Sequence, residues 1–315
     1  MKLLALLVPL ISFAVSVHAD VLPSRAPEPA DNPSTPAKIA LGRALFYDTR
    51  LSAGKPMSCI SCHDLSGSGE NNQARAELPD GKFSRHAVPT VWNAAFLSSY
   101  FWSGGAASLE EQTEGPLSEM GLGDINNVVV RISSITGYSP LFAAAFGDGG
   151  VTLDRVEKAL GAFERTLLTP NSPYDRFVGG DATALPVQAQ RGLKLFDRLG
   201  CATCHSGVVF AGPTAAPGQA NMEKFPVFSG SDYEKKYQLI EPGRASWRVA
   251  PLRNIARTAP YFHNGSVPTL EEAVRVMAKT QLNRDVTEEE TAELVAFLNG
   301  LSGELPKISK PELPN

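Results

Sequence analysis

Cysteine and histidine are scarce in this chain of 315 residues, which contains four cysteines and five histidines. No internal apolar run approaches the roughly 20 residues that a membrane-spanning helix needs. A basic patch is also absent, and the formal net charge is −4 at pH 7, which argues against nucleic acid as a partner. Because no stretch alternates convincingly between apolar and polar residues with a period of two, extensive β-sheet is not expected.

The amino terminus has the pattern of an export signal. Lys2 precedes an apolar run over residues 3–17, and Val17-His18-Ala19 has the small residues of a signal-peptidase site. Residues 1–19 are therefore predicted to be a secretory signal peptide that is cleaved before Asp20. A short membrane anchor is the alternative, although the run is short for a span. A cleaved signal predicts a periplasmic protein.

The four cysteines fall into two copies of one motif. Cys59-Ile60-Ser61-Cys62-His63 and Cys201-Ala202-Thr203-Cys204-His205 both have the spacing that attaches c-type haem. The two thiols reach the two vinyl groups of one porphyrin edge, and the adjacent histidine ligates the iron. Disulfides would leave the histidines unexplained, and export disfavours zinc because c-type haem is assembled outside the cytoplasm. We therefore expect two haem c groups, bound through Cys59, Cys62, Cys201 and Cys204, with His63 and His205 as iron ligands.

A short internal sequence repeat supports two related units. Gly42-Arg43-Ala44-Leu45-Phe46 precedes the first haem motif, and Gly192-Leu193-Lys194-Leu195-Phe196 precedes the second. The sequence therefore predicts a mainly α fold with two cytochrome-c-like haem domains and long irregular loops. The expected divisions are a Pro- and Ala-rich leader, extended or disordered, over 20–36, an N-terminal haem domain over 37–175, a C-terminal haem domain over 176–305 and a tail over 306–315.

Helix starts are predicted from capping residues. Residues suited to an N-cap stand before four amphipathic stretches, at Thr35, Thr152, Thr269 and Thr287. The helix after Thr152 is expected to continue to Leu168. Residues 65–83 and 206–246, rich in Gly, Ser, Asn or Pro, are expected to form irregular loops beside the first haem and over the second.

The sixth iron ligand decides what each haem can do. Methionine or histidine in that position suits electron transfer, whereas an open position binds a small ligand. Outside the signal peptide and the two motifs, the candidates are His86, His263, Met57, Met120, Met222 and Met277.

Further sequence blocks carry a family resemblance. They occupy 41–48, 89–94, 101–102, 109–112, 115–116, 119–120, 163–167, 171–176, 251–255 and 258–265. With the two haem motifs among them, these blocks make the chain resemble the bacterial dihaem cytochrome c peroxidase and MauG family from about Leu41 to Gly303.

The resemblance implies unequal haems. The haem on His63 would be the peroxide site, and the haem on His205 would be the higher-potential point of electron entry. Met277 stands where peroxidase members place the distal ligand of the second haem, whereas the MauG branch has a tyrosine there. The helical pattern alone favours a core position for Met277, because it shares a face with Leu270, Ala273 and Val274, and the family register reverses this preference.

The resemblance also assigns residues to peroxide chemistry. Glu119 matches the family's active-site glutamate and Gln112 its companion glutamine, because a carboxylate over the iron can move a proton between the two peroxide oxygens. Trp102 matches the tryptophan that lies between the haems and is an electron relay in this interpretation. The alternatives are a surface charge for Glu119 and a core residue for Trp102.

The chain departs from the family pattern in several places. Trp102 is followed by Ser-Gly-Gly-Ala instead of Asp-Gly-Arg-Ala, and the segment from Pro116 to Glu119 is shorter than usual. His86 is either a removable sixth ligand of the first haem or a hydrogen-bonding loop residue. The family's calcium site would use backbone oxygens of Thr258 and Pro260, but the expected Asn before the Pro-Thr block is Ala87. His263 is expected to contact a propionate of the second haem or a loop.

These observations lead to one leading hypothesis for function. It is a periplasmic dihaem peroxidase that reduces hydrogen peroxide to water with electrons from a small cytochrome c or cupredoxin. One alternative is a MauG-like oxidase that modifies a tryptophan of a partner protein, and Met277 argues against it. The other is a dihaem electron carrier without catalysis, for which Glu119 and Gln112 would be unnecessary. Whether the active form is a monomer or a homodimer stays open at the level of sequence.

Overall fold

A computed structural model describes residues 20–315, and the predicted signal peptide over 1–19 lies outside the described residues. The described chain is mainly helical, as the sequence predicts, with one antiparallel pair of short strands. The helices are α1 (Pro36–Tyr47), α2 (Cys59–Cys62), α3 (Leu109–Met120), α4 (Asn126–Ser134), α5 (Tyr138–Phe146), α6 (Leu153–Glu164), α7 (Pro173–Val178), α8 (Val187–Leu199), α9 (Asp232–Tyr237), α10 (Leu270–Leu282) and α11 (Glu288–Asn299). The strands are β1 (Met222–Lys224) and β2 (Ser246–Arg248).

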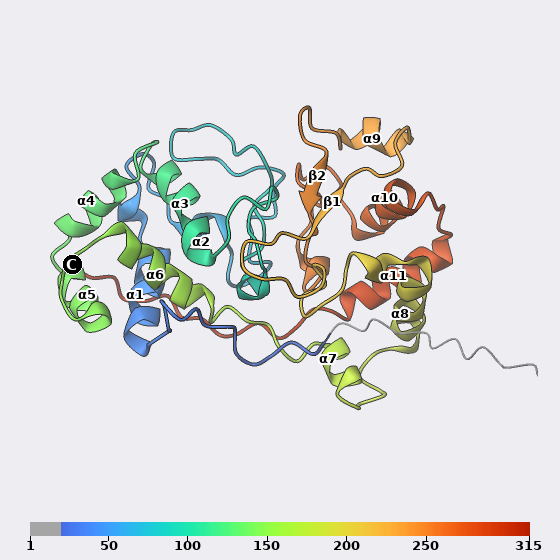
Figure 1. Cartoon of the computed structure of the whole chain (residues 1–315), viewed down its shortest axis with the longest axis horizontal. Helices are drawn as coiled ribbons and strands as arrows, with labels where there is room; N and C mark the ends of the chain where they lie inside the picture. Colours follow the sequence, from blue (N-terminus) through green and yellow to red (C-terminus); the bar gives the residue numbers. More distant parts are fainter. Residues whose placement is uncertain (1–19) are drawn as a thin grey trace, which may run out of the picture.

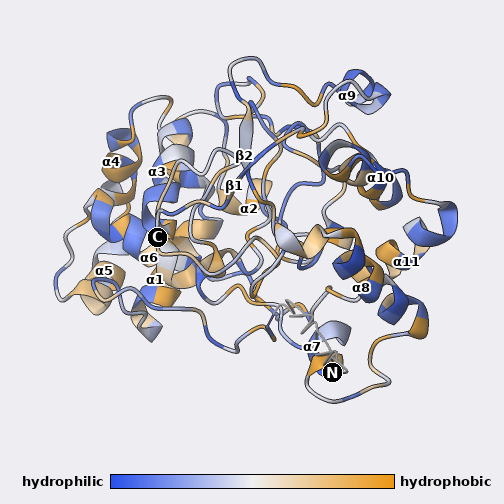
Figure 2. Cartoon of the chain, turned by 45° about the vertical axis from the view of Figure 1, so that its right-hand side comes forward, coloured by the Kyte–Doolittle hydropathy of each residue, from blue (hydrophilic) through white to orange (hydrophobic). Residues whose placement is uncertain are grey.

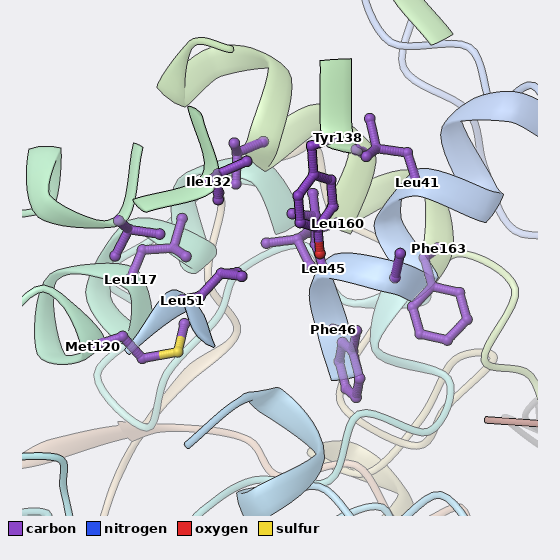
Figure 3. Packing of buried hydrophobic residues seen from close by; sticks show 14 of the residues in the cluster. Leu41, Leu45, Phe46, Leu51, Leu117, Met120, Ile132, Tyr138, Leu160 and Phe163 are labelled. Carbon is purple, nitrogen blue, oxygen red and sulfur yellow. The ribbon is translucent and has the colours of Figure 1, made fainter. Parts of the chain in front are cut away.

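The two largest hydrophobic clusters among residues 20–315 lie in the two halves of the protein. Figure 1 shows α1, α3, α4, α5 and α6 in one half and α8, α10 and α11 in the other. The first cluster contains buried residues of α1, α3, α4, α5 and α6, and we call this half the N-terminal lobe (Figure 3). The second contains buried residues of α8, α10 and α11 with the chain between them, and we call it the C-terminal lobe. Figure 2 shows α1 and α5 mainly in the hydrophobic colours, whereas the peripheral α9 is mainly hydrophilic.

The echoed glycines make the same helix crossing in each lobe. A Cβ on Gly42 of α1 would lie 1.9 Å from the carbonyl oxygen of Ala159 on α6. A Cβ on Gly192 of α8 would lie 1.9 Å from the carbonyl oxygen of Glu293 on α11. Glycine is therefore needed at both crossings, because any side chain would push the helix backbones apart. The repeated Gly-x-x-Leu-Phe sequence thus corresponds to a repeated packing arrangement.

The predicted caps are present. The side chains of Thr35, Thr152, Thr269 and Thr287 each accept a hydrogen bond from the backbone N–H three residues further on, which satisfies one of the free donors at a helix start. The helix after Thr152 ends at Glu164, earlier than the expected Leu168. Leu167 is still buried in the cluster of the N-terminal lobe, where its carbonyl accepts a hydrogen bond of 2.9 Å from the N–H of Asn93.

Both end segments are packed against the body of the protein. The leader lacks helix, as expected, but it is anchored, because Leu22 and Asn32 are buried. The tail returns from the C-terminal lobe to α5 (Figure 1), where the N–H of Gly137 donates to the carbonyl of Asn315 at 2.7 Å. Leu305, Ile308 and Leu313 pack against the cluster of the N-terminal lobe.

The segment between 206 and 246 has more structure than the sequence predicts. It contains β1, α9 and the start of β2. These strands have only three residues each, which is too short for a period-two pattern to be recognised. Residues 65–83 contain no helix, in agreement with the expected loop.

Among residues 20–315, no single helix is long and apolar enough to cross a bilayer. Helices α4 and α5 taken together have the length and composition of a span, but they are bent by 108° at the break between them.

Candidate functional site

The first CxxCH motif forms a short helix at the edge of a cavity. Ser58 caps α2, and its own N–H bonds to the hydroxyl of Ser61 at 3.1 Å. Cys59, Cys62 and His63 line a cavity of about 420 Å³ whose other walls are mostly apolar, within the size range of cofactor sites.

The cysteines have the properties of neutral thiols. All four are free of disulfides in the described chain. Burial raises the pKa of Cys62 and raises the pKa of Cys201 to about 12. No group of three or more His, Cys, Asp or Glu able to hold a metal ion occurs among residues 20–315.

The two motif histidines are held in the same way. Nδ1 of His63 lies 3.0 Å from the carbonyl oxygen of Gly69, and Nδ1 of His205 lies 3.0 Å from that of Phe210. A hydrogen bond from Nδ1 to a carbonyl is the usual support for a histidine that binds metal through Nε2. Burial lowers the pKa of His63 to about 4 and also lowers that of His205. Both are therefore neutral imidazoles, the form that ligates iron.

An aromatic ring accompanies each of these histidines. Phe46 of α1 lies 6.2 Å from the ring of His63, and Phe196 of α8 lies 6.5 Å from the ring of His205. Each phenylalanine is the last residue of a Gly-x-x-Leu-Phe repeat. The helix that carries the repeat, α1 or α8, therefore packs an aromatic ring near the histidine of its own CxxCH motif. This equivalence fits two similar haem sites.

Helix α3 faces the cavity with the predicted catalytic pair. Gln112 and Glu119 are seven residues apart, two turns along one helix face, and both line the cavity together with Pro116. Glu119 is exposed. The structure thus brings both predicted residues into the cavity that contains His63.

Trp102 connects this cavity to the C-terminal lobe. It lines the cavity and also packs against the C-terminal cluster. Its indole Nε1 donates to the carbonyl of Ala87 at 2.9 Å, and its own carbonyl accepts from the N–H of Arg248 at 3.0 Å. The tryptophan is therefore fixed where the two lobes meet.

His86 and His263 belong to one cluster of rings. His86 also lines the cavity, and its ring lies 5.3 Å from that of Trp247 and 5.9 Å from that of His263. His263 stacks on Trp247 with ring centroids 3.8 Å apart, and burial lowers the pKa of His263 to about 4. Nε2 of His86 lies 2.7 Å from Oε2 of Glu241, so His86 forms a hydrogen bond, and iron ligation by His86 stays a prediction.

Sequence reasoning missed two buried ionisable groups in the cavity wall. Glu164 of α6 is buried, and burial raises the pKa of its carboxyl to about 8. Arg248 of β2 is 6% exposed, and burial lowers its pKa to about 10. Glu164 follows Leu160 by four residues, which places it on the buried helix face; this spacing was a usable signal. No comparable signal pointed to Arg248.

A buried cation and an unpaired donor at the lobe junction suit a cofactor with carboxylates. The Arg248 guanidinium donates to the carbonyls of Phe101 at 2.9 Å and Val249 at 3.2 Å, yet no acid within residues 20–315 forms an ion pair with it. The buried indole N–H of Trp247 likewise has no hydrogen-bond partner in the described chain. Buried cations and donors are costly unless an acceptor meets them. Haem propionates are acceptors of this kind, so these residues fit the group that the CxxCH motifs predict.

Residues predicted for the second haem lie on the C-terminal cluster. Cys201 and Met277 both pack against it, but they are on different segments and ligation by Met277 stays a prediction. Thr258 and Pro260 flank carbonyls that already accept hydrogen bonds, since the Asn72 amide donates to those of Arg257 and Ala259 at 3.0 Å each. Calcium at Thr258 and Pro260 also stays a prediction.

Comparison with known proteins identifies the chain. The family model for di-haem cytochrome c peroxidase matches residues 36–183, and a RoxA-like, cytochrome c-like model matches 247–281. The cytochrome c551 peroxidase of Pseudomonas aeruginosa is 34% identical, over 93% of this chain and 86% of that protein. The MauG protein of Methylophilus methylotrophus is 30% identical, over 93% and 90%. The cytochrome c peroxidase Ccp of Escherichia coli is 34% identical, and the match spans 60% of its length.

Solved structures agree with these relatives. A MauG-like protein associated with microbial copper homeostasis has a TM-score of 0.78 at 27% identity, covering 90% of this chain and 95% of that one. The diheme peroxidase BthA of Burkholderia thailandensis has a TM-score of 0.67 at 22% identity over 92% of each chain, which shows a shared fold. The fold and its CxxCH sites thus define an oxidoreductase of the c-type haem class. The chain belongs to the di-haem cytochrome c peroxidase family.

Proposed function

We propose that this protein is a periplasmic dihaem cytochrome c peroxidase. It reduces hydrogen peroxide to two water molecules with two electrons from a small cytochrome c or cupredoxin and two protons. The observation that carries the proposal is that Gln112 and Glu119 line the same cavity as His63 and both cysteines of its motif. Relatives named as peroxidases at 34–35% identity support it.

In this proposal each residue of the cavity has a role. Cys59, Cys62 and His63 hold the first haem, which supplies the iron at which peroxide is reduced. Glu119 moves a proton from the near to the far peroxide oxygen, the transfer that O–O cleavage needs. Gln112 orients the peroxide, because its amide offers both a donor and an acceptor.

The remaining haem and the electron path follow from the two lobes. Residues 37–175 and 176–305 are two cytochrome-c-like domains, which the equivalent glycine crossings and ring-to-histidine distances support. Cys201, Cys204, His205 and Met277 hold the second haem, where electrons enter. Trp102, fixed where the lobes meet, is the relay between the two haems. A calcium ion at the backbone oxygens of Thr258 and Pro260 belongs to the same proposal.

A second candidate function is that of a MauG-like oxidase acting on a partner protein. MauG proteins at 30–33% identity and the MauG-like structure support it, as does the loss of the acid and base that usually follow Trp102. Met277 weighs against it, because the MauG branch has tyrosine there. A non-catalytic electron carrier is less well supported, since it would not require Gln112 and Glu119 in the cavity.

Turnover measurements separate these functions. The mature holoprotein is mixed with reduced cytochrome c and hydrogen peroxide, and the oxidation rate is followed. Glu119→Gln is expected to lower kcat by about 10²–10⁴-fold, the usual share of general acid–base catalysis. Glu114→Gln is the matched control, because Glu114 is exposed on the same helix and does not line the cavity.

Two results would contradict the peroxidase. Full turnover by Glu119→Gln would remove the catalytic assignment of Glu119. No turnover by the native protein, together with a long-lived oxidised state that decays only with a partner protein, would favour the MauG-like function.

A further inference from the structure

Glu241 ties a loop of the N-terminal lobe to the C-terminal lobe. Its Oε2 lies 2.7 Å from Nε2 of His86, and its Oε1 pairs with the guanidinium of Arg85. Nε of Arg244 lies 3.9 Å from Oε1. The Glu241 side chain is 14% exposed and that of His86 21%, so the contact between them is well shielded from water.

The hydrogen bond decides which atom of His86 is available. The ion pair with the Arg85 guanidinium indicates that Glu241 is a carboxylate. A carboxylate only accepts hydrogen bonds, so Nε2 of His86, 2.7 Å from Oε2, carries the donated proton. A protonated nitrogen has no lone pair for iron.

The place of His86 makes this bond matter for the first haem. His86 and His63 line the same cavity, and an imidazole that reaches a haem iron opposite a histidine closes the sixth position. The His86 ring is also held edge-on to Trp247, at 5.3 Å, and to His263, at 5.9 Å. Both rings belong to the C-terminal lobe, as does Glu241. His86 is thus bound to that lobe on several sides, although its backbone belongs to the other one.

We propose that Glu241 is a positioning residue that holds His86 away from the iron of the first haem, so that the oxidised protein has an open peroxide site without prior reduction. The inference rests on the proposed function only in taking the His63 haem as the peroxide site. A charge-assisted hydrogen bond is about twice as strong as a neutral one, and here it is reinforced by Arg85. Without the Glu241 carboxylate, Nε2 of His86 is free to bind iron.

Spectroscopy of the oxidised holoprotein tests the proposal without any turnover. Electron paramagnetic resonance and visible absorption report whether each haem is high-spin, with an open position, or low-spin, with two ligands. The native protein is expected to show one haem of each kind. Glu241→Ala is expected to lose most of the high-spin signal and to bind added cyanide more slowly. The double variant Glu241→Ala/His86→Ala is expected to regain both properties, which a protein that is merely misfolded would not do.

Two further variants complete the experiment. Arg85→Ala removes the exposed partner of Glu241 and leaves the bond to His86, so it is expected to keep the native spectrum. His86→Ala alone is expected to keep the high-spin signal, because His86 is not a ligand in the native protein.

Contrary results are equally clear. Two low-spin haems in the native protein, one of which becomes high-spin in His86→Ala, would overturn the proposal, as would an unchanged spectrum in Glu241→Ala. A native protein that shows the predicted spectra but does not reduce peroxide would count against the proposed function alone.

Discussion

Arg253 and Asp175 form a nearly completely buried ion pair that joins the start of α7 to the segment before α10. Nη2 of Arg253 lies 2.9 Å from Oδ1 of Asp175 and Nη1 lies 3.1 Å from Oδ2, and the two side chains are 1% and 4% exposed. Oδ1 also accepts from the N–H of Leu22 at 3.1 Å, and Oδ2 from the hydroxyl of Ser172 at 2.8 Å. The N–H of Ser172 also donates to Oδ2 at 3.0 Å, so both carboxylate oxygens are satisfied inside the protein.

Breaking this ion pair should be costly. Arg253→Met is expected to lower the free energy of unfolding by about 3–5 kcal/mol, because it leaves a buried charge without its partner. Urea denaturation of the holoprotein measures the effect. The double variant Arg253→Met/Asp175→Leu should lose less unfolding free energy than the two single variants lose together. A loss in the double variant that equals this sum would show that the two residues do not couple.

The Arg253–Asp175 ion pair also makes the free energy of unfolding fall at acid pH. Burial raises the pKa of Asp175, but the charge and hydrogen bonds of Arg253 outweigh it, and the net shift is below the ordinary value of 3.8. A lowered pKa means that the stabilisation is present above about pH 4 and is lost as the pH falls through the folded pKa. Unfolding free energies measured from pH 6 to pH 3 should converge for the native protein and Asp175→Asn.

The glycine crossings predict a matched pair of destabilised variants. Gly42→Ala and Gly192→Ala should each lower the free energy of unfolding by about 1–3 kcal/mol or more, because the new Cβ meets a helix carbonyl. The comparable distances in the two lobes predict comparable losses. Lys194→Ala, on the exposed face of α8, is the control and should stay within about 0.5 kcal/mol of the native value. A neutral Gly192→Ala would contradict the close crossing.

Glu164 makes the free energy of unfolding depend on pH in the opposite direction to Asp175. Burial raises its pKa to about 8 from 4.5, so the folded protein holds a proton that the unfolded chain has released. Stability is therefore expected to fall as the pH rises between these values, by about 1.4 kcal/mol for each pH unit. Glu164→Gln should remove this slope and be relatively more stable at pH 8 than at pH 5. Parallel curves for the two proteins would show that Glu164 titrates normally.

Met277 has a redox signature if it is the distal ligand of the second haem. Met277→Ala is expected to lower the reduction potential of one haem, on the order of tenths of a volt, because methionine ligation raises the potential. Met222→Ala is the control, since Met222 lies on β1 and the family resemblance assigns the ligand position to Met277 and not to Met222. Spectroelectrochemistry checks both variants, and unchanged potentials in Met277→Ala would exclude the ligand.

The sequence predicts well whatever depends on local spacing. The CxxCH motifs and the four threonine caps are each contained within a few residues, and the structure shows the motif histidines held and the caps formed. Gln112 and Glu119 are assigned by the family resemblance, and both line one cavity.

Contacts between distant segments were not accessible in the same way. Glu241 and His86 are 155 residues apart, and neither has a local pattern that indicates the other. Arg248 is buried because of what surrounds it after folding, and its sequence neighbours do not predict this. Glu164 is predictable in part. Its spacing from Leu160 predicts that it is buried, but not that it lines the cavity.

The two end segments have a consequence for how the molecule unfolds. The carbonyl of Asp20 accepts from Arg253 in the C-terminal lobe at 3.0 Å, whereas that of Asn315 accepts from Gly137 in the N-terminal lobe. The segment before the N-terminal lobe thus bonds to the C-terminal lobe, and the segment after the C-terminal lobe bonds to the N-terminal lobe. Heat or denaturant that opens one lobe also releases a segment on which the other relies, so the two cores should melt in a single cooperative transition.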